Sequence, residues 1–263
     1  RPAGRRQRAL ASQRRTKLND VSQLILYEDN HLIVAVKPPR MLTQGDITGD
    51  ADLHSLLKEY IRVKYEKPGE AYLGLIHRID RQVGGLLAFA RTSKAAGRLS
   101  RQLREGSLSR EYIAVCRGRA PATFQLNDWL QKDEQTNTVR VLPKYLKLQG
   151  KQASLSGQTI SFTDEKSLVA IRLQTGRAHQ IRAQMAHFGH PLLGDARYNK
   201  EGASGLIALW GMRLALSHPI TGKAMVFVCA PGRMPGGWPR SAHFDPYQRD
   251  LDALERHWPD LTQ

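Results

Sequence analysis

Apolar and polar residues alternate along the chain in runs whose spacing predicts a protein of mixed helices and strands. Residues 24–27 and 32–36 are short apolar runs, and the polar residues 28–31 separate them. Two such runs joined by a polar turn predict a β-hairpin. Residues 37–39, Lys-Pro-Pro, then end the second strand because proline has no N–H to donate to a strand ladder.

Two segments with helical periodicity follow. After Asp52, apolar residues at 53, 56, 57, 60 and 61 predict an amphipathic helix that ends before Pro68. A second helix is predicted between a Thr92-Ser93 cap and Gly106. Its basic residues, with Arg110 in a loop beyond it, indicate either a solvated charged face or a track for RNA phosphates. These helical residues are Lys94, Arg98, Arg101 and Arg104.

The rest of the chain predicts further strands and one more helix. Apolar runs predict strands at 86–90, 112–115, 168–173 and 226–229. Residues 120–165 are polar and predict loops with a hairpin around 139–141. A helix is expected over 178–188, with Ile181, Met185 and Phe188 on a packed face and with His179 and Arg182 on the opposite, free face.

These elements do not follow the regular strand–helix–strand rhythm of a doubly wound sheet, and no internal repeat is present. The expected fold class is therefore α+β, with a mixed, largely antiparallel central sheet flanked by helices. No apolar run approaches the roughly eighteen residues that a membrane-spanning helix needs. The two cysteines, Cys116 and Cys229, are too few for a disulfide framework or a structural zinc site.

The distribution of charge divides the chain and indicates its partner. The 263 residues carry 40 Lys and Arg against 24 Asp and Glu, a net charge of +16. Residues 1–17 contribute +7, residues 18–235 contribute +11 and residues 236–263 contribute −2. We therefore expect a basic flexible tail at 1–19, a folded domain at 20–235 and a C-terminal extension at 236–263. A basic folded body favours nucleic acid over a membrane surface.

The composition of the tail also predicts a subcellular location. Residues 1–17 contain no acid and a single leucine, so they cannot bury enough apolar surface to fold alone. Such a start is typical of what remains of, or follows, an organellar transit peptide, and it predicts a mitochondrion or other organelle. A nonspecific basic arm on a cytoplasmic protein is the alternative.

Two polar motifs could carry chemistry. Residues 77–81 read His-Arg-Ile-Asp-Arg and precede two glycines, and residues 175–182 read Thr-Gly-Arg-Ala-His-Gln-Ile-Arg. The carboxylate of Asp80 thus lies between two arginines, which favour its ionised form and suit it to act as a nucleophile or base. Ordinary salt bridging is the alternative interpretation of the same residues.

Read together, the two motifs resemble HRLDR and GRTHQIR of the RluA-type pseudouridine synthases, with Ile79 in place of leucine. The likeness covers most of residues 20–235, which we then interpret as a pseudouridine synthase catalytic domain. Further segments match the family pattern in the same order. The residues after the first motif match at 85–94 and the K-x-Y-x-A-x-V strand at 110–115. GHPIxGDxxY matches at 189–198 and HPxTG at 217–223.

The resemblance implies an enzyme that isomerises uridine to pseudouridine in a structured RNA, ribosomal or transfer RNA, without a cofactor or metal. Asp80 matches the catalytic aspartate, which either attacks the nucleoside or removes the 2′ proton. Arg182 matches the arginine that pairs with it, Tyr112 the aromatic against the target base, and Arg78 the residue that helps displace the nucleotide. We expect further RNA contacts from Arg81, Arg177 and His179, together with Lys94, Arg98 and Arg101.

The chain also departs from the family pattern. Gly84 replaces a hydroxyl residue that could hydrogen-bond within the catalytic loop, and Ala178 stands where threonine is common. No S4-type RNA-binding module precedes residue 20. RNA binding is therefore expected from the basic folded domain at 20–235, from the tail or from a partner. These departures motivate an alternative, an RNA-binding assembly factor with reduced or absent turnover in a ribosomal or pre-ribosomal particle.

A metal hydrolase is a third and weaker interpretation. It would use His179, His187 and His190 as ligands, but Gly189 ends the predicted helix between the last two, and no glutamate lies among them.

Overall fold

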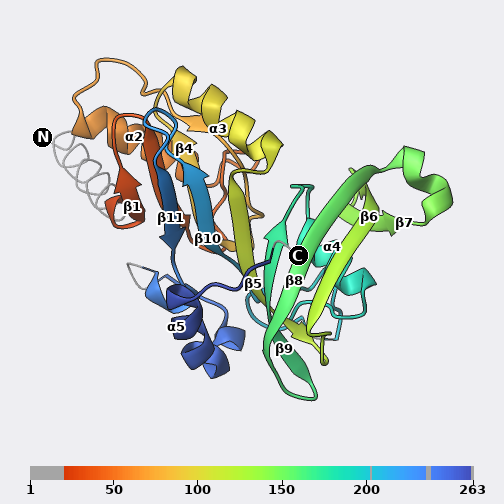
Figure 1. Cartoon of the computed structure of the whole chain (residues 1–263). Helices are drawn as coiled ribbons and strands as arrows, with labels where there is room; N and C mark the ends of the chain where they lie inside the picture. Colours follow the sequence, from red (N-terminus) through yellow and green to blue (C-terminus); the bar gives the residue numbers. More distant parts are fainter. Residues whose placement is uncertain (1–20, 202, 235–237, 262–263) are drawn as a thin grey trace, which may run out of the picture.

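The computed structural model describes residues 21–201, 203–234 and 238–261 (Figure 1). The predicted tail at 1–19 lies outside these described residues. The strands of one 11-stranded sheet are β1 (Ile25–Glu28), β2 (Leu32–Lys37), β3 (Gly74–Leu75), β4 (Gly84–Ala90), β5 (Ser109–Arg117), β6 (Thr123–Asp133), β7 (Thr138–Leu142), β8 (Lys151–Phe162), β9 (Lys166–Leu173), β10 (Leu209–Ser217) and β11 (Ala224–Val228). The helices are α2 (Leu53–Lys64), α3 (Ser93–Glu105), α4 (Gln180–His187) and α5 (Gln248–Arg256), with short 3₁₀ turns at Lys144–Gln149, Pro231–Arg233 and Ala242–Tyr247.

The sheet is mixed and largely antiparallel, as predicted. Its order is β1-β2-β4-β10-β5-β9-β8-β6-β7, with β11 paired to β10 and β3 to β4. Among the named strands, β4 and β10 form the parallel pair and the other pairs are antiparallel. β5 lies between the two halves of the sheet (Figure 1), so residues of β5 can contact groups from both.

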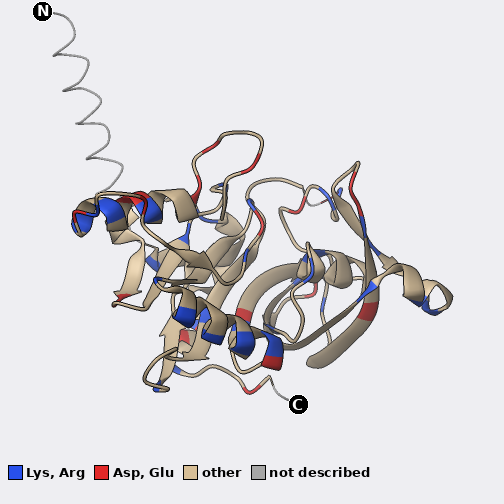
Figure 2. Ribbon diagram, turned by 90° about the horizontal axis from the view of Figure 1, so that it is seen from above, with Lys and Arg blue, Asp and Glu red and all other residues tan. Residues whose placement is uncertain are grey.

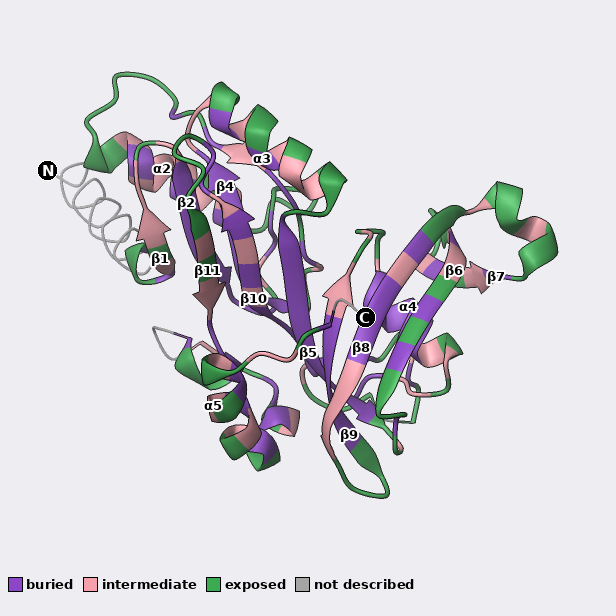
Figure 3. Cartoon of the chain, viewed as in Figure 1, coloured by how far each residue is buried: buried purple, intermediate pink, exposed green. Residues whose placement is uncertain are grey.

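Helices cover both faces of the sheet, which is why its central strands are continuously apolar. Every residue of β2 and β4 is buried (Figure 3). Ile33, Phe89 and Ala114 pack in one cluster with α2 and α4, whereas their neighbours on the same strands pack in a second cluster with α3 and α5. We call the side with α2 and α4 the inner face and the side with α3 and α5 the outer face.

Several predicted elements are confirmed together with their caps. β1 and β2 form the hairpin. The side chain of Asp52 accepts the Ser55 N–H at 2.8 Å at the start of α2. Thr92 begins α3 in the same way, and Gly106 ends it with a φ of 76°.

Two predictions about strands are wrong. Residues 120–165 are not mainly loops, because β6 and β8 run for 11 and 12 residues and pair along their length. β6 alternates exposed and buried residues from Thr123 to Leu126, and most of the partly buried positions of β8 are polar, so neither strand has a continuous apolar run. No strand was expected at Leu209–Ser217, yet β10 is central and pairs with β4, β5 and β11. Gly211 and Arg213 interrupt its apolar run, and the register with β5 shifts between them.

The described part of the C-terminal segment packs on the outer face. Phe244, Tyr247, Leu251 and Leu254 are buried in the same cluster as α3. The Ser156 hydroxyl donates to the Leu261 carbonyl at 2.7 Å, which fixes the end of this segment on β8. None of the helices among the described residues has the length and apolar character needed to cross a membrane.

Gly84 and Gly85 are required by close packing where β4 meets β10. A β-carbon on Gly84 would lie 2.2 Å from the ring of Trp210, and one on Gly85, whose φ is 135°, would lie 2.4 Å from the Gly211 nitrogen. Trp210 is itself fixed because its indole N–H donates to the Cys229 carbonyl at 2.6 Å. Where the RluA-type pattern that the motifs resemble has a hydroxyl residue, this chain has a glycine that makes room for a tryptophan ring.

This packing predicts opposite effects for two Gly→Ala substitutions. Gly84→Ala forces a methyl group into the Trp210 ring and should destabilise the fold by about 1–3 kcal/mol. Gly97→Ala, in α3 with open space around it, should stabilise by about 0.5–1 kcal/mol because alanine is the better helix former. Denaturant unfolding of both variants checks the pair, and equal effects of the same sign would contradict this account.

Candidate active site

Asp80 lies in the loop that leads into β4, and buried polar contacts hold this loop on both sides of it. The Thr43 hydroxyl donates to the Ile79 carbonyl at 2.9 Å and accepts the Ile79 N–H at 3.4 Å. After Asp80, the Val83 N–H donates to the Asp80 carbonyl at 3.0 Å and closes a turn. The position of the carboxylate is thus set by neighbours on both sides in the sequence.

Lys37 supports the same loop from the end of β2. Its ammonium donates to the carbonyls of Pro38, Met41 and Arg81 at 2.9, 2.7 and 3.2 Å. These three acceptors use all three N–H groups of an ammonium. Burial lowers the pKa of Lys37 to about 7, and the charge of Asp80 opposes that shift. Lys37 therefore ties the loop of Asp80 to the strand end beside it.

Arg182 pairs with Asp80 across the site. Its Nη1 lies 3.1 Å from Oδ2 of Asp80. Its Nε donates to Oδ2 of Asp195 and its Nη2 donates to Oδ1 of Asp195, each at 2.8 Å. Asp195 is fully buried, whereas 26% of the Asp80 side chain is exposed. The fork of Arg182 is thus fixed by a buried acid and offers its remaining edge to an acid that is open to solvent.

The surroundings of Arg182 differ from the predicted free helix face. α4 begins at Gln180, not 178, and residues 180–185 are all buried. Ile181 and Met185 pack on the inner face, while Ala183 packs against β6, β7 and β8. Burial alone would lower the pKa of Arg182, but hydrogen bonds and charge from Asp195 and Asp80 raise it.

His179 contacts the same carboxylate from the turn before α4. Its φ is 49°, and its Nε2 lies 3.8 Å from Oδ2 of Asp80. The Tyr198 hydroxyl accepts the Val139 N–H at 2.8 Å and lies 3.0 Å from Nδ1 of His179. When the Tyr198 hydroxyl donates to Nδ1, a neutral His179 carries its N–H on Nε2, toward Asp80. Burial lowers the pKa of His179, which favours this neutral ring.

Tyr112 forms the apolar floor next to Asp80. It lies on β5, is 6% exposed and packs in the inner-face cluster with Ile79 and Ile181. Burial raises the pKa of Tyr112; the Arg110 charge opposes the rise and the Asp80 charge adds to it. The structure thus brings together Asp80, Tyr112 and Arg182 from a loop, a central strand and a helix.

The other predicted contacts lie farther out. Arg78, Arg81 and Arg177 are exposed around the site; Arg81 pairs with Asp50 at 2.7 Å and Arg177 donates to the Gln152 carbonyl at 2.9 Å. The basic residues of α3 are exposed on a helix that packs on the outer face, so the structure does not bring them to Asp80. The predicted contacts on this helix are Lys94, Arg98 and Arg101. Figure 2 shows the basic residues as blue bands on several helices of the ribbon.

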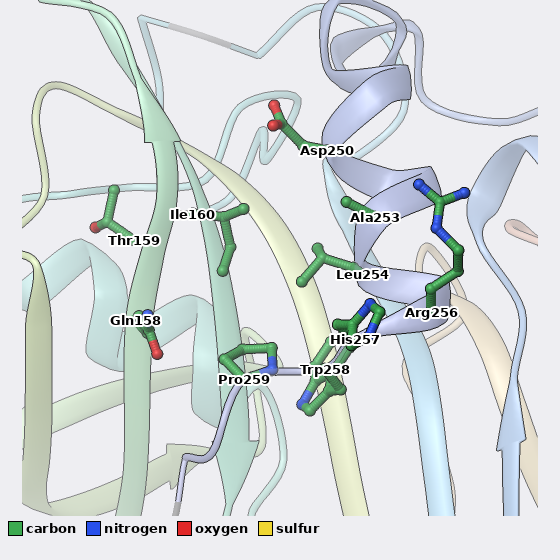
Figure 4. A pocket seen from close by; sticks show the side chains of 10 residues that line it. All are labelled: Gln158, Thr159, Ile160, Asp250, Ala253, Leu254, Arg256, His257, Trp258 and Pro259. Carbon is green, nitrogen blue, oxygen red and sulfur yellow. The ribbon is translucent and has the colours of Figure 1, made fainter.

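A separate hollow lies away from Asp80. It lies between β8 and the end of α5, and Thr159, Leu254 and Trp258 are among the residues that line it (Figure 4). It does not include any predicted site residue. Within the described residues, no group of three or more His, Cys, Asp or Glu side chains is arranged to hold a metal ion.

The sequence-based prediction missed Lys37, Thr43, Asp195 and Tyr198. A lysine that ends a wholly apolar strand and precedes two prolines is a signal for Lys37. Asp195 and Tyr198 stand in the matched GHPIxGDxxY segment, but nothing in their spacing indicates that they face α4. Only the folded chain brings them to Arg182 and His179.

Comparison with known proteins identifies the family. The model of the RNA pseudouridylate synthase family matches residues 31–187. The ribosomal large subunit pseudouridine synthase D of Vibrio parahaemolyticus is 33% identical over 238 residues, which span 84% of this chain and 71% of that protein. The chain belongs to the RNA pseudouridylate synthase family. The resemblance read from the motifs is therefore confirmed, and the chain is an RNA pseudouridine synthase, an isomerase.

Other pseudouridine synthases agree with this assignment. The ribosomal large subunit pseudouridine synthase C of Buchnera aphidicola is 32% identical over 214 residues, 78% of this chain and 66% of that protein. The solved structure of human RNA pseudouridylate synthase domain containing 4 superposes with a TM-score of 0.69 at 18% identity, over 92% of this chain and 98% of that chain. The latter likeness shows the shared synthase fold.

The buried His77 next to the site predicts an acid-dependent loss of stability. Burial, followed by the charge of Arg110, lowers the pKa of His77 from 6.5 to about 3. Between these values the unfolded chain binds a proton that the native chain does not, so stability falls as the pH falls, by about 1.4 kcal/mol per pH unit for this residue.

His77→Gln keeps an acceptor for the Ala88 N–H, which donates to Nε2 of His77 at 3.3 Å, but it cannot titrate. Its unfolding free energy should therefore fall less steeply than that of the wild type between about pH 6.5 and pH 5. Urea unfolding across this window measures the slopes, with the exposed His257→Gln as the control. Parallel slopes for the wild type and His77→Gln would contradict the assignment.

Proposed function

We propose that this synthase isomerises a uridine of ribosomal RNA with Asp80 as its catalytic carboxylate. The observation that carries the proposal is the position of Asp80, whose partly exposed carboxylate is held by the fixed fork of Arg182 at 3.1 Å. Two relatives that match most of this chain are named for the large ribosomal subunit, which supports ribosomal RNA as the substrate class.

The reaction moves one bond without a net change in atoms. The N1–C1′ glycosidic bond breaks, the base turns, C5 bonds to C1′, and the C5 proton is lost as N1 gains one. Asp80 would act by attack on the nucleoside or by removing the 2′ proton, and both routes need an ionised carboxylate. Oδ2 is directed at Arg182 and His179, and within the described residues the structure gives Oδ1 no hydrogen bond, so Oδ1 is the oxygen available to the nucleoside.

The surrounding residues suit a nucleotide that has left its RNA helix. Tyr112 offers a buried ring beside the carboxylate on which a base can stack. Arg78 is exposed two residues before Asp80, and it would occupy the space that the displaced nucleotide leaves. Arg81 and Arg177 lie at the edges of the site, where phosphates of the surrounding RNA would pass.

The departures at Gly84 and Ala178 do not argue for an inactive scaffold. Thr43 and Lys37 hold the catalytic loop without a hydroxyl at position 84, whose space is taken by Trp210. Ala178 is exposed in the turn before α4. The groups that fix Arg182 and Asp80 are all present, so we propose an active enzyme.

Asp80→Asn tests this function. The amide keeps the size of the side chain but cannot act as a nucleophile or base, so pseudouridine formation should fall by at least a thousandfold. Mapping of pseudouridine in the RNA of cells that carry the variant, and assays with that RNA in vitro, measure the loss.

Asp50→Asn is the matched control, because it removes another exposed carboxylate beside an arginine and should leave the modification intact. Persistence of every modified uridine in Asp80→Asn cells would refute the proposal. Normal ribosome assembly with Asp80→Asn, together with loss of the modification, would also exclude a role as a scaffold alone.

A further inference from the structure

Arg110 is a buried arginine without a partner next to the active site. It does not lie in the loop expected after the helix but on β5, two residues before Tyr112, in agreement with the match of 110–115 to a strand motif. Side chains two residues apart on a strand point to the same face, so Arg110 shares the inner face with Tyr112. Arg110 is 9% exposed, and its Nε is fully buried without a hydrogen-bond partner.

The acid next to it does not serve as its partner. Glu111 points to the opposite face, where it pairs with Arg213 at 2.6 Å and lies 3.9 Å from Arg172. Within the described residues, no hydrogen bond or ion pair reaches the guanidinium of Arg110. Buried charges in proteins are normally paired, because their desolvation is costly. An unpaired one therefore marks a place where an anion from outside completes the site.

Two neutral side chains lie next to Arg110. His77 is buried and uncharged, and Tyr112 is a buried phenol. A β-carbon on Gly176 would lie 2.5 Å from Nη1 of Arg110, so the guanidinium packs against the backbone of the loop before α4. Gly176 and Arg177 are exposed, so the loop that covers the guanidinium lies at the surface of the protein.

We propose that Arg110 binds a phosphodiester of the bound RNA, next to the nucleotide whose base lies on Tyr112. This inference rests on the proposed function for the place of the base. The two residues are separated along β5 by about 7 Å, which is comparable with the distance between the base and the phosphate of one nucleotide. A planar guanidinium can donate two hydrogen bonds to the two free oxygens of a phosphodiester.

Arg110→Met tests the subsite, because methionine fills similar space without charge. RNA affinity is measured with a single-stranded uridine oligonucleotide in the Asp80→Asn background, so turnover does not enter. The dissociation constant should rise about ten- to a hundredfold, and the slope of log K against log salt should become shallower by about 0.7. Arg249→Met, an exposed arginine on α5 with the same change in net charge, is the control.

A structural role for Arg110 gives a different result. Removal of an unpaired buried charge should leave the thermal midpoint of Arg110→Met unchanged or higher, whereas loss of a structural contact lowers it. Inorganic phosphate should raise the midpoint of the wild type more than that of Arg110→Met. Arg110→Lys should keep the salt slope and lose part of the affinity, because it retains the charge without the fork.

Equal affinity and salt slope for Arg110→Met and Arg249→Met would overturn the subsite, as would a lower midpoint of Arg110→Met with an unchanged slope. The proposed function is judged separately, by whether the Asp80→Asn enzyme still forms pseudouridine. The two proposals can therefore fail independently.

Discussion

The ion pair between Asp80 and Arg182 joins parts of the chain that are 102 residues apart and organises the site around it. The Asp195 side of Arg182 is buried, whereas the Asp80 side is partly exposed to solvent. Asp195 fixes two nitrogens of the guanidinium in the core, and the third is left for an acid that solvent can reach. Such an arrangement compensates the burial of Arg182 with Asp195 and keeps Asp80 available for chemistry.

The fold makes this arrangement possible because the two covered faces of the sheet carry different side chains. One face is packed with apolar residues, and the other carries the residues of the site. The outer face packs α3 and the C-terminal helix α5 on apolar side chains. The inner face carries Tyr112 and Arg110 on β5, and the loop of Asp80 and the start of α4 meet above them. Because β5 lies at the middle of the sheet, its inner-face residues are reached from both halves.

The local features of this fold could be predicted from the sequence, because they depend on neighbours in the chain. The caps Asp52 and Thr92 and the Gly106 end of α3 are of this kind. The central strand β10 was not predicted, since its Gly211 looks like a strand breaker until Gly85 is seen against it. The motifs indicated Asp80, Tyr112 and Arg182, and the structure places them together. Helical periodicity assigned Arg182 to a free face, because spacing within one helix cannot show that the Asp195 segment covers it.

The single-turnover rate of Arg182→Lys at saturating RNA tests most directly whether the fixed fork positions the carboxylate for reaction. Lysine keeps the positive charge but cannot hold Asp195 with two nitrogens and Asp80 with a third. Release of the C5 hydrogen from uridine should slow by about a hundredfold or more, while the dissociation constant for RNA changes by less than about threefold. A wild-type rate of release from Arg182→Lys would contradict the account.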